Sequence, residues 1–488
     1  MMRRALPALA VSAAFLFAGM YLFTALPRVL YPHDLDFLEN NSLMQSLRFA
    51  AGQPVYAAPS ADFVATIYTP LYTWLGGLLF RFVPPGFLPL RLISFTASLL
   101  TAALIGFIAH RESHQRWLAL ACAGLYLGGY RISGFWYDLA RVDLLALLLV
   151  LLGLTLGIYA NGSRLRLTLS ALTLALAFFT KQTALMFGLA LVVYHLARST
   201  PHALRWLALP FVAFTLLPLF TFHIITNGWF SFYIFTAAAA DAEDVTRLWR
   251  YLGLELFGVM GALSVTALWV ARRVGLKDQP WLWMIGTAAF VSGIGRASVG
   301  GNLNNLMPVY ALLCLAPALL MCEFSPPSPD RAREACGQER GGGGVRFASL
   351  ALLLQLAFGV YNPLRYIPTP ATRAQGDALI AQLQKIDGPV LVMLEPYYAW
   401  RAGHAPSAQV ASLWHLHHWL NEPWPNDLLT RLETRYYSAI ISAESLFETG
   451  PEIYPLLITN YPITQTLTTP STLTGLPIRP QTLYLPQP

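Results

Sequence analysis

The stretch that decides the fold is the apolar run ALPALAVSAAFLFAGMYLFTALP at residues 5–27, followed by the acidic sequence LYPHDLDFLEN at residues 30–40. The apolar run is long enough to cross a bilayer, because about 20 residues of α-helix span the hydrocarbon core. The acidic sequence places Asp34, Asp36 and Glu39 immediately beyond that run. Ionisable groups so close to the hydrocarbon are costly and tend to be paired or functional. These carboxylates are therefore the first candidates for a functional site.

The composition predicts a polytopic α-helical membrane protein. Of the 488 residues, 56% are hydrophobic and only 12% are charged, whereas about 25% of residues in soluble domains are charged. In lipid each apolar run must bond its own backbone, which favours helices. We predict about eleven transmembrane helices, at residues 5–27, 89–110, 117–136, 143–160, 165–180, 183–198, 204–226, 250–271, 280–295, 303–322 and 346–362.

The basic residues predict the orientation of these helices, because short cytoplasmic loops collect Arg and Lys. If residues 63–83 do not cross the membrane, every short basic loop lies on the cytoplasmic side with the N-terminus. If they cross, all those loops lie outside. We therefore expect residues 63–83 to form interfacial helices broken by Pro70 and the Pro84-Pro85 pair. The acidic sequence and the C-terminus then face out.

The chain is expected to divide into two domains. Residues 1–362 form the transmembrane domain, in which 31–88 are the first periplasmic loop. Residues 323–345 are rich in Pro, Gly and charge, which predicts a flexible cytoplasmic linker. Residues 363–488 are more polar and contain short apolar runs, which is typical of a small periplasmic α/β domain.

Charge, cysteines and the N-terminus narrow the function further. The net charge of +7 is carried mainly by the cytoplasmic loops, so it reports orientation and no nucleic-acid partner is expected. None of the four cysteines falls in the predicted periplasmic parts, so no disulfide framework is implied. The first apolar run exceeds the usual signal-peptide core of about 7–15 residues and lacks a clear A-x-A site, so we expect it to remain as an anchor.

Three outward segments carry further candidate residues. The sequence WYDLARVD at 136–143 places Asp138, Arg141 and Asp143 between two apolar helices; an Arg141–carboxylate pair that fixes a helix end is the alternative. Lys181, in AFFTKQTALMF, is a suitable point charge for a phosphate, although it can also reach the interface from a helix end.

The third outward segment is GIGRASVGGNLNNLMPVY at residues 293–310. Its Arg296, paired glycines and asparagines, including Asn302 and Asn305, offer donors for a phosphate or sugar. A simple polar turn is the alternative. The cluster WHLHHW, with three histidines, lacks a standard tetrahedral metal spacing and predicts surface or substrate contacts. Glu255 is expected to pack against a neighbouring hydrogen-bond donor.

Carboxylates and cations on one membrane face suit a reaction on a lipid-linked anionic substrate. A carboxylate acts as general base on the incoming group, while cations hold the departing phosphate. For the first-loop carboxylates the alternative is that they cap a helix N-terminus, where they interact favourably with the helix dipole.

The chain resembles the GT-C superfamily of membrane glycosyltransferases, especially the bacterial branch related to protein O-mannosyltransferases and aminoarabinose transferases. The resemblance covers roughly residues 1–325 and fits the remainder in layout. It rests on the order of the motifs DLDFLEN, GQPVY, IYTPLY, RLIS, ARVD, FFTKQTAL and GGNLNNLMP.

The resemblance implies an inverting transfer of a sugar from a polyprenyl-phosphate donor to a lipid, glycan or protein acceptor, at the periplasmic face of a bacterial inner membrane. The catalytic carboxylate would be Asp36 or Asp34, with Glu39 nearby, because the sequence lacks the family's common adjacent Asp-Glu pair. The family's second acidic motif maps onto Asp143, with Asp138 beside it.

Substrate-binding residues also follow from the resemblance. Arg141, Lys181 and Arg296 would neutralise the donor phosphate, and Tyr68, Asn302 and Asn305 lie in matching motifs. Some members of the superfamily use a divalent cation, so that Mg²⁺ or Mn²⁺ between Asp36 and Asp143 is an open expectation. The C-terminal domain would sit over the site and could shape the choice of acceptor.

Two other classes of function remain open from the sequence. A transporter or flippase for lipid-linked sugars would also need outward cations, but it would more often show internal repeats and interrupted helices. A non-catalytic relative that binds a lipid carrier would keep the same fold. The long first loop with its carboxylates favours the transferase.

Overall fold

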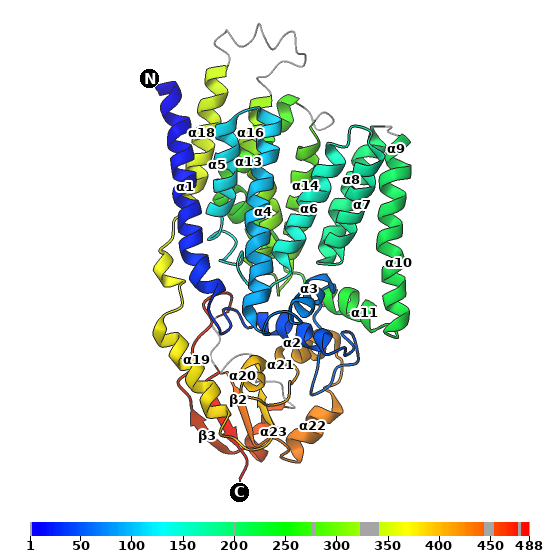
Figure 1. Ribbon diagram of the computed structural model, residues 1–488, viewed down its shortest axis with the longest axis vertical. Coiled ribbons are helices and arrows are strands. Elements are labelled where there is room, and N and C mark those ends of the chain that lie inside the picture. The colour runs from blue at the N-terminus through cyan, green and yellow to red at the C-terminus, as the bar shows by residue number, and fades with distance from the viewer. Residues whose placement is uncertain are drawn as a thin grey trace.

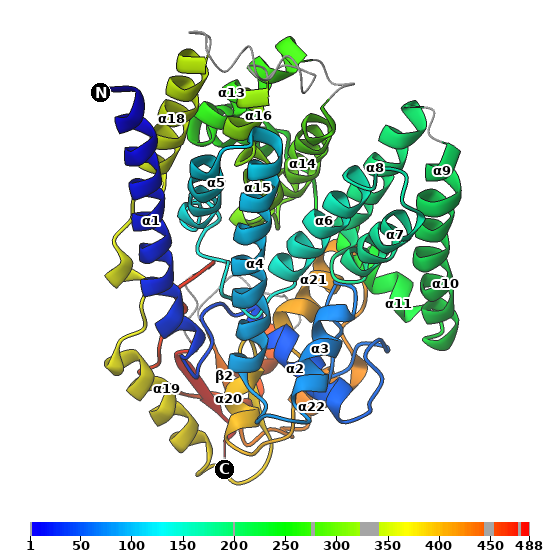
Figure 2. The same ribbon diagram turned by 45° about the horizontal axis from the view of Figure 1, so that its top comes forward.

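A computed structural model describes residues 2–198, 201–274, 279–322, 341–443, 453–476 and 480–487. It consists of a helical bundle and a smaller part with a mixed sheet, which lies at one end of the bundle (Figures 1 and 2). Residues 323–340 of the predicted linker at 323–345, Cys336 among them, lie outside the described residues.

The bundle consists of long helices and a few short ones. Its main helices are α1 (Met2–Val29), α4 (Phe87–Ser113), α5 (Arg116–Gly128), α6 (Asp143–Ile158), α7 (Arg164–Phe178), α8 (Leu185–Ala197), α10 (Leu209–Ile225), α13 (Gly261–Val274), α14 (Pro280–Ala297), α15 (Met307–Leu313), α16 (Ala316–Cys322) and α18 (Gly341–Phe358). Its other helices are α2 (Glu39–Ala50), α3 (Leu71–Leu79), α9 (Pro201–Ala203), α11 (Trp229–Ser231) and α12 (Val245–Arg250).

Several of these helical segments are long and apolar enough to cross a membrane. The described part of the chain contains five, or six if one bent pair counts as a span, and these are Ala5–Val29, Phe87–Ser113, Leu204–Ile225, Leu303–Met321 and Gly343–Arg365, with Val245–Val274 as the bent pair. The helices α5, α6 and α8 are also apolar but shorter. The prediction of a multi-span helical protein is confirmed, whereas the number eleven and the orientation stay predictions.

The span predicted at residues 250–271 is not one straight helix. Residues Val245–Val259 and Gly261–Val274 form two helices that meet at 88°. The cause is a widened, π-helical stretch at Tyr251–Val259, which ends where the Met260 amide bonds to the Glu255 carbonyl 2.9 Å away. Such wide turns commonly accompany sharp bends in helices.

The predicted span at 117–136 is too long. Helix α5 ends at Gly128, and the next residues form an irregular loop that is buried inside the bundle. Gly134 and Phe135 have φ angles of +72° and +66°, which an α-helix does not accommodate. Local amide bonds, such as Phe135 to the Tyr130 carbonyl, satisfy the buried backbone.

Residues 63–83 contain one short helix instead of the expected several. Helix α3 starts directly after Pro70 and is nine residues long, which is too short to cross a bilayer. The residues before it, 63–70, form bends and irregular structure without a helix. The expectation that this stretch is no transmembrane helix agrees with the structure.

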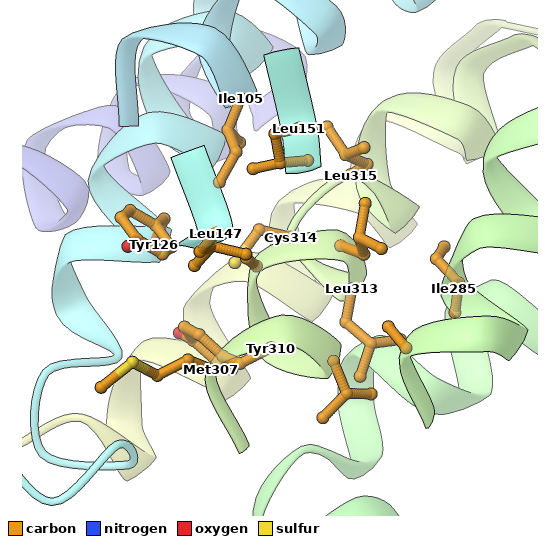
Figure 3. Close-up of a cluster of buried hydrophobic side chains, with 14 of the residues drawn as sticks. Ile105, Tyr126, Leu147, Leu151, Ile285, Met307, Tyr310, Leu313, Cys314 and Leu315 are labelled. Atoms are coloured by element: carbon orange, nitrogen blue, oxygen red, sulfur yellow. The ribbon is translucent and has the colours of Figure 1, made fainter. Parts of the chain in front are cut away.

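The centre of the bundle is a close-packed apolar core (Figure 3). Buried side chains from five helices meet there: Ile105 of α4, Tyr126 of α5, Leu147 of α6, Ile285 of α14 and Leu313 of α15. On the outside of α1, α10 and α13 large apolar side chains are exposed instead. This inverse pattern is what lipid contact requires, because hydrocarbon solvates apolar surface.

The C-terminal part is a small mixed sheet with helices. Strands β1 (Val390–Val392), β2 (Ala439–Ser442), β3 (Ile463–Thr466) and β4 (Thr482–Leu485) have the order β1-β2-β4-β3, with β1 and β2 parallel and the other pairs antiparallel. The helices are α19 (Pro370–Leu383), α20 (Pro396–Arg401), α21 (Val410–Leu420), α22 (Asn426–Glu433) and α23 (Ile453–Asn460).

This C-terminal part packs directly on the first loop and on α2 (Figure 1). The Tyr397 amide donates to Asn40 Oδ1 over 3.1 Å, and Gln409 Nε2 donates to the Phe37 carbonyl over 2.8 Å. The acidic sequence that follows α1 is therefore enclosed between the bundle and the C-terminal part. The boundary at residue 362 stays a prediction.

Candidate active site

The candidate site lies where the first loop, the loop before α6 and the loop before α8 meet. Asp143 is the first residue of α6, where the helix dipole favours a carboxylate. Its Oδ1 accepts from Lys181 Nζ over 2.7 Å and from Asn304 Nδ2 over 3.0 Å. Its Oδ2 lies 3.7 Å from Arg141 Nε. Asp143 thus holds two of the three expected phosphate-binding cations, Arg141 and Lys181, in one place.

Aromatic rings support these cations. The Arg141 guanidinium lies 4.8 Å from the ring centre of Trp136, and its Nη2 donates to Tyr68 Oη over 3.0 Å. Lys181 Nζ lies 5.9 Å from the centre of the Tyr68 ring. A ring face attracts a cation, so Tyr68 and Trp136 fix the direction in which both charges point.

Among the first-loop carboxylates, Asp36 has the surroundings that best suit proton transfer. Its side chain is 1% exposed, and its Oδ1 accepts from the Leu38 amide over 2.9 Å. Burial raises the pKa of Asp36 to about 7, while the positive charge of Arg141 works in the opposite direction. A carboxyl with such a pKa can exchange a proton near neutral pH.

Three buried polar atoms at this place lack hydrogen-bond partners among the described residues: Asp36 Oδ2, Arg141 Nε and Asp143 Oδ2. Native proteins leave few buried polar atoms unbonded, and the exceptions call for an explanation. Their grouping marks a place where a polar ligand would supply the missing partners.

Glu39 is not available for chemistry, because four donors bind it. Arg91 Nε and Nη2 donate to its two oxygens over 2.8 and 2.6 Å, and the amides of Ala140 and Leu35 donate over 2.7 Å each. Burial alone would raise the pKa of Glu39, but Arg91 and the amides outweigh it and lower the pKa. Glu39 therefore serves the architecture of the loops.

Asp34 belongs to a second cluster of carboxyl side chains, which includes Glu395 of the C-terminal part. Its Oδ1 accepts from Tyr398 Oη over 3.1 Å and its Oδ2 from Asn40 Nδ2 over 3.3 Å. Glu395, directly before α20, is 1% exposed, and neither of its side-chain oxygens bonds to another described residue. Burial raises the pKa of Asp34 to about 6, and burial together with Asp34 raises the pKa of Glu395 well above its usual range.

Two other predicted site residues are engaged in ion pairs away from this cluster. Asp138 is bound by Arg28 Nε and by Tyr130 Oη, each over 2.6 Å. Arg296 binds both oxygens of Glu255 over 2.9 and 2.6 Å. The expectation that Glu255 packs against a donor agrees with this geometry.

Of the asparagines in the 293–310 segment, two bond to their own segment and one bonds to the candidate site. Asn302 Oδ1 accepts from the Leu303 amide over 2.7 Å, and Asn305 Nδ2 donates to the Gly295 carbonyl over 2.8 Å. The asparagine that reaches Asp143 is Asn304, which the sequence did not single out. A substrate contact of Asn302 or Asn305 stays a prediction.

The sequence also missed Arg91, Arg28, Glu395 and Trp136. For Arg91 and Arg28 a signal existed, since each is an arginine at the end of an apolar run, where a charge is usually paired. The sequence offers no such signal for Glu395, whose surroundings come from a loop more than 300 residues away.

A divalent cation does not fit between Asp36 and Asp143. Arg141 and Lys181 already place two positive charges on Asp143, and the charge of Arg141 also acts on Asp36. A cation there would be repelled by both. Elsewhere, the described residues contain no group of three potential metal ligands, the histidines of α21 included. No step of the mechanism proposed below therefore uses a divalent cation.

An apolar cleft opens beside the cations. It is lined by Asp143, Ala146, Leu147, Val150, Lys181, Thr183, Ala184, Phe187, Asn304, Met307 and Pro308. Three of the polar members, Asp143, Lys181 and Asn304, belong to the cluster described above, and apart from Thr183 the others are apolar. The cleft therefore joins a charged end to an apolar slot between α6, α8 and α15.

The bundle with its enclosed first loop and small terminal sheet shares its fold with solved structures of ArnT and of an archaeal oligosaccharyltransferase, in agreement with the sequence resemblance. It is similar to ArnT from Cupriavidus metallidurans in the apo state, with a TM-score of 0.62 at 15% identity over 98% of this chain and 97% of that chain. No family model and no curated protein matches the chain.

Two further solved structures share the fold. ArnT from Cupriavidus metallidurans bound to undecaprenyl phosphate has a TM-score of 0.60 at 14% identity, over 98% of this chain and 97% of that chain. The Archaeoglobus fulgidus oligosaccharyltransferase tethered with an acceptor peptide has a TM-score of 0.54 at 10% identity, over 93% of this chain and 72% of that chain. At these identities the likeness concerns the fold.

The Glu39–Arg91 pair gives a stability prediction. Arg91→Met leaves the Glu39 carboxylate buried without its cation, which is expected to cost about 3–5 kcal/mol. The midpoint of thermal unfolding in detergent should fall clearly below that of the wild type. The matched control is Arg373→Met, since Arg373 pairs with Asp377 at the surface, where both side chains are more than half exposed. Equal effects of the two substitutions would contradict the assignment.

The carboxyl pair of Asp34 and Glu395 gives a pH prediction. Because burial raises the pKa of both groups, the folded chain binds their protons more tightly than the unfolded chain does. The stabilising contribution of Asp34 is complete below pH about 4 and is lost as the pH rises through about 6. That of Glu395 is lost as the pH rises through its own raised pKa. Glu395→Gln should therefore unfold at a higher temperature than the wild type at pH 8 and lose that advantage at pH 4.

The control for this pH series is Glu433→Gln, which removes an exposed carboxyl of α22. Its unfolding midpoint should follow that of the wild type at every pH. If Glu395→Gln also follows the wild type throughout, the buried pair does not control the docking of the C-terminal part.

Proposed function

We propose that the protein is an inverting glycosyltransferase. It would move a sugar from a polyprenyl-phosphate donor to a lipid, glycan or protein acceptor at the periplasmic face of a bacterial inner membrane. The observation that carries the proposal is the placement of the unbonded Asp36 Oδ2 beside Arg141, with Lys181 at the charged end of an apolar cleft.

The cleft and its cations suit the lipid-phosphate part of the donor. A phosphate prefers charge-assisted bonds from Lys and Arg, and Lys181 and Arg141 supply them. The isoprenoid chain is apolar and would extend along Leu147, Val150 and Phe187, which form the apolar side of the cleft. ArnT, which shares the fold, binds undecaprenyl phosphate, and this supports the same class of ligand here.

Asp36 is the better candidate for the general base. Asp34 has both oxygens bonded and Glu39 is held by Arg91, whereas Asp36 keeps one oxygen without a partner. Its pKa of about 7 also matches the task, because a base works best when its pKa lies near the operating pH.

The reaction would proceed as a single displacement. The acceptor oxygen or nitrogen attacks the anomeric carbon while its proton passes to Asp36 Oδ2. The bond between that carbon and the phosphate oxygen breaks, and the electron pair leaves with the polyprenyl phosphate. Arg141 and Lys181 stabilise the negative charge that develops on the phosphate. Asp143 would orient both cations without touching the reacting atoms.

The first test is transfer or release of radiolabelled sugar from a panel of polyprenyl-phosphate sugars by the purified protein. Asp36→Asn should lower the rate about 10²–10⁴-fold, the usual contribution of a general base. In the wild type kcat/KM should rise with pH and level off above about 7, because the active form of Asp36 is the carboxylate.

The matched control is Asp34→Asn, which should retain far more activity than Asp36→Asn because Asp34 is already engaged. The reverse order would move the base to Asp34. If the wild type consumes no donor but still binds lipid-linked sugars or carries them across liposomes, the protein is a carrier or transporter and not a transferase.

Donor binding gives a separate prediction. Lys181→Gln keeps a hydrogen bond to Asp143 but removes the charge, so the KM for the donor should rise roughly tenfold to a hundredfold, as a hydrogen bond to a charged group is worth about 1.5–3 kcal/mol. Lys385→Ala removes an exposed lysine of the C-terminal part and serves as the control. An unchanged KM in Lys181→Gln would place the phosphate elsewhere.

A further inference from the structure

A turn from the C-terminal part covers Asp36. The amides of Leu473 and Thr474 both donate to the Leu35 carbonyl, over 3.0 and 2.9 Å. Arg28 Nη2 donates to Thr474 Oγ1 over 2.9 Å. The two amide bonds join the turn to Leu35, the residue directly before Asp36, although more than 400 positions of sequence separate the two segments.

Gly475 is the residue of this turn that touches Asp36. A Cβ atom at Gly475 would collide with Asp36 Oδ2 and would lie 3.6 Å from the Trp136 ring. Its φ of +73° is also a conformation that favours glycine. The turn therefore seats against the unbonded oxygen of the candidate base because position 475 has no side chain.

The turn is a thin cover between Asp36 and solvent. Asp36 is 1% exposed, whereas Gly475 and Leu476 on the outer side of the turn are exposed. Leu476 is apolar and half exposed, at 52%. No acceptor can reach Asp36 Oδ2 while the backbone of Gly475 lies against it.

We propose that the turn Thr472–Leu476 is a displaceable cover that keeps water away from Asp36 until an acceptor takes its place. This inference rests on the proposed transferase function, and it gives the turn a role in selecting the acceptor over water. The bonds that join the turn to the first loop and to α1 include the two amide bonds to the Leu35 carbonyl and the bond from Arg28, and their polar groups can bond to water when the turn moves away. A covered base limits wasteful hydrolysis of the donor, as closure of an active site against water does in general.

Two substitutions loosen the cover in different ways. Thr474→Val keeps the shape of the side chain but removes the bond from Arg28. Gly475→Ala places a methyl group against Asp36 Oδ2 and strains the backbone. Both variants should hydrolyse the donor faster in the absence of acceptor, with Thr474→Val faster by roughly two- to tenfold, the change in an opening equilibrium expected from one lost hydrogen bond.

The matched control is Gly403→Ala. Gly403 also has a positive φ, +99°, but a Cβ atom there meets nothing within 4 Å, so this variant carries the backbone strain without touching Asp36. Its hydrolysis rate should equal that of the wild type. Hydrolysis is measured with whichever polyprenyl-phosphate sugar the wild type consumes.

A second measurement needs no substrate. A water-soluble carbodiimide labels protonated carboxyls that solvent can reach, and labelled positions are found by peptide mass spectrometry. At pH 6 Asp36 should be protected in the wild type and in Gly403→Ala, and labelled in Thr474→Val and Gly475→Ala. This readout also separates an opened cover from a general loss of fold, because the buried Glu39 should stay unlabelled in all four proteins.

The outcomes distinguish the two levels of the proposal. If the wild type uses no donor, the transferase function fails, while the labelling still tests the cover. If the wild type transfers sugar but both loosened variants hydrolyse donor at the wild-type rate and keep Asp36 protected, the turn is a fixed part of the fold and the inference is overturned. An equal loss of hydrolysis and transfer in both variants would overturn it as well.

Discussion

The candidate site depends on one buried interaction, the ion pair between Arg91 at the start of α4 and Glu39 at the start of α2. Arg91 uses all five of its donors: three N–H groups reach the carbonyls of Arg28, Tyr31 and His33, and two reach Glu39. Glu39 in turn accepts from two loop amides. The end of α1, the first loop and the loop before α6 are thereby tied to one point, although no regular element connects them.

The Arg91–Glu39 pair places three neighbouring carboxylates in different surroundings. Glu39 is ionised and paired, Asp34 accepts from two donors beside Glu395, and Asp36 keeps a free oxygen with a pKa of about 7. Nearly identical side chains thus acquire different chemical abilities through burial and partners. The proposed division of roles, with Asp36 as base and Arg141 as phosphate ligand, follows from these surroundings.

The sequence predicted the multi-span helical class and drew attention to Asp36, Arg141, Asp143 and Lys181, which the structure brings together; their roles stay proposals. Hydropathy and short motifs allow these predictions because both are read directly from neighbouring residues in the sequence. The bend at Met260 depends on a change of hydrogen-bond pattern that hydropathy does not encode. The contacts of Arg91, Arg28, Asn304, Glu395 and Gly475 likewise join distant segments, and no local pattern in one sequence reveals them.

In the proposed mechanism the cations held by Asp143 receive a lipid phosphate beside Asp36. The most direct test is an experimental structure of the protein with a polyprenyl phosphate bound. In that structure the phosphate oxygens should lie within hydrogen-bond distance of Lys181 and Arg141, and the isoprenoid chain should lie in the cleft beside Phe187. A phosphate bound elsewhere, with both cations still engaged only by Asp143 and their present neighbours, would contradict it.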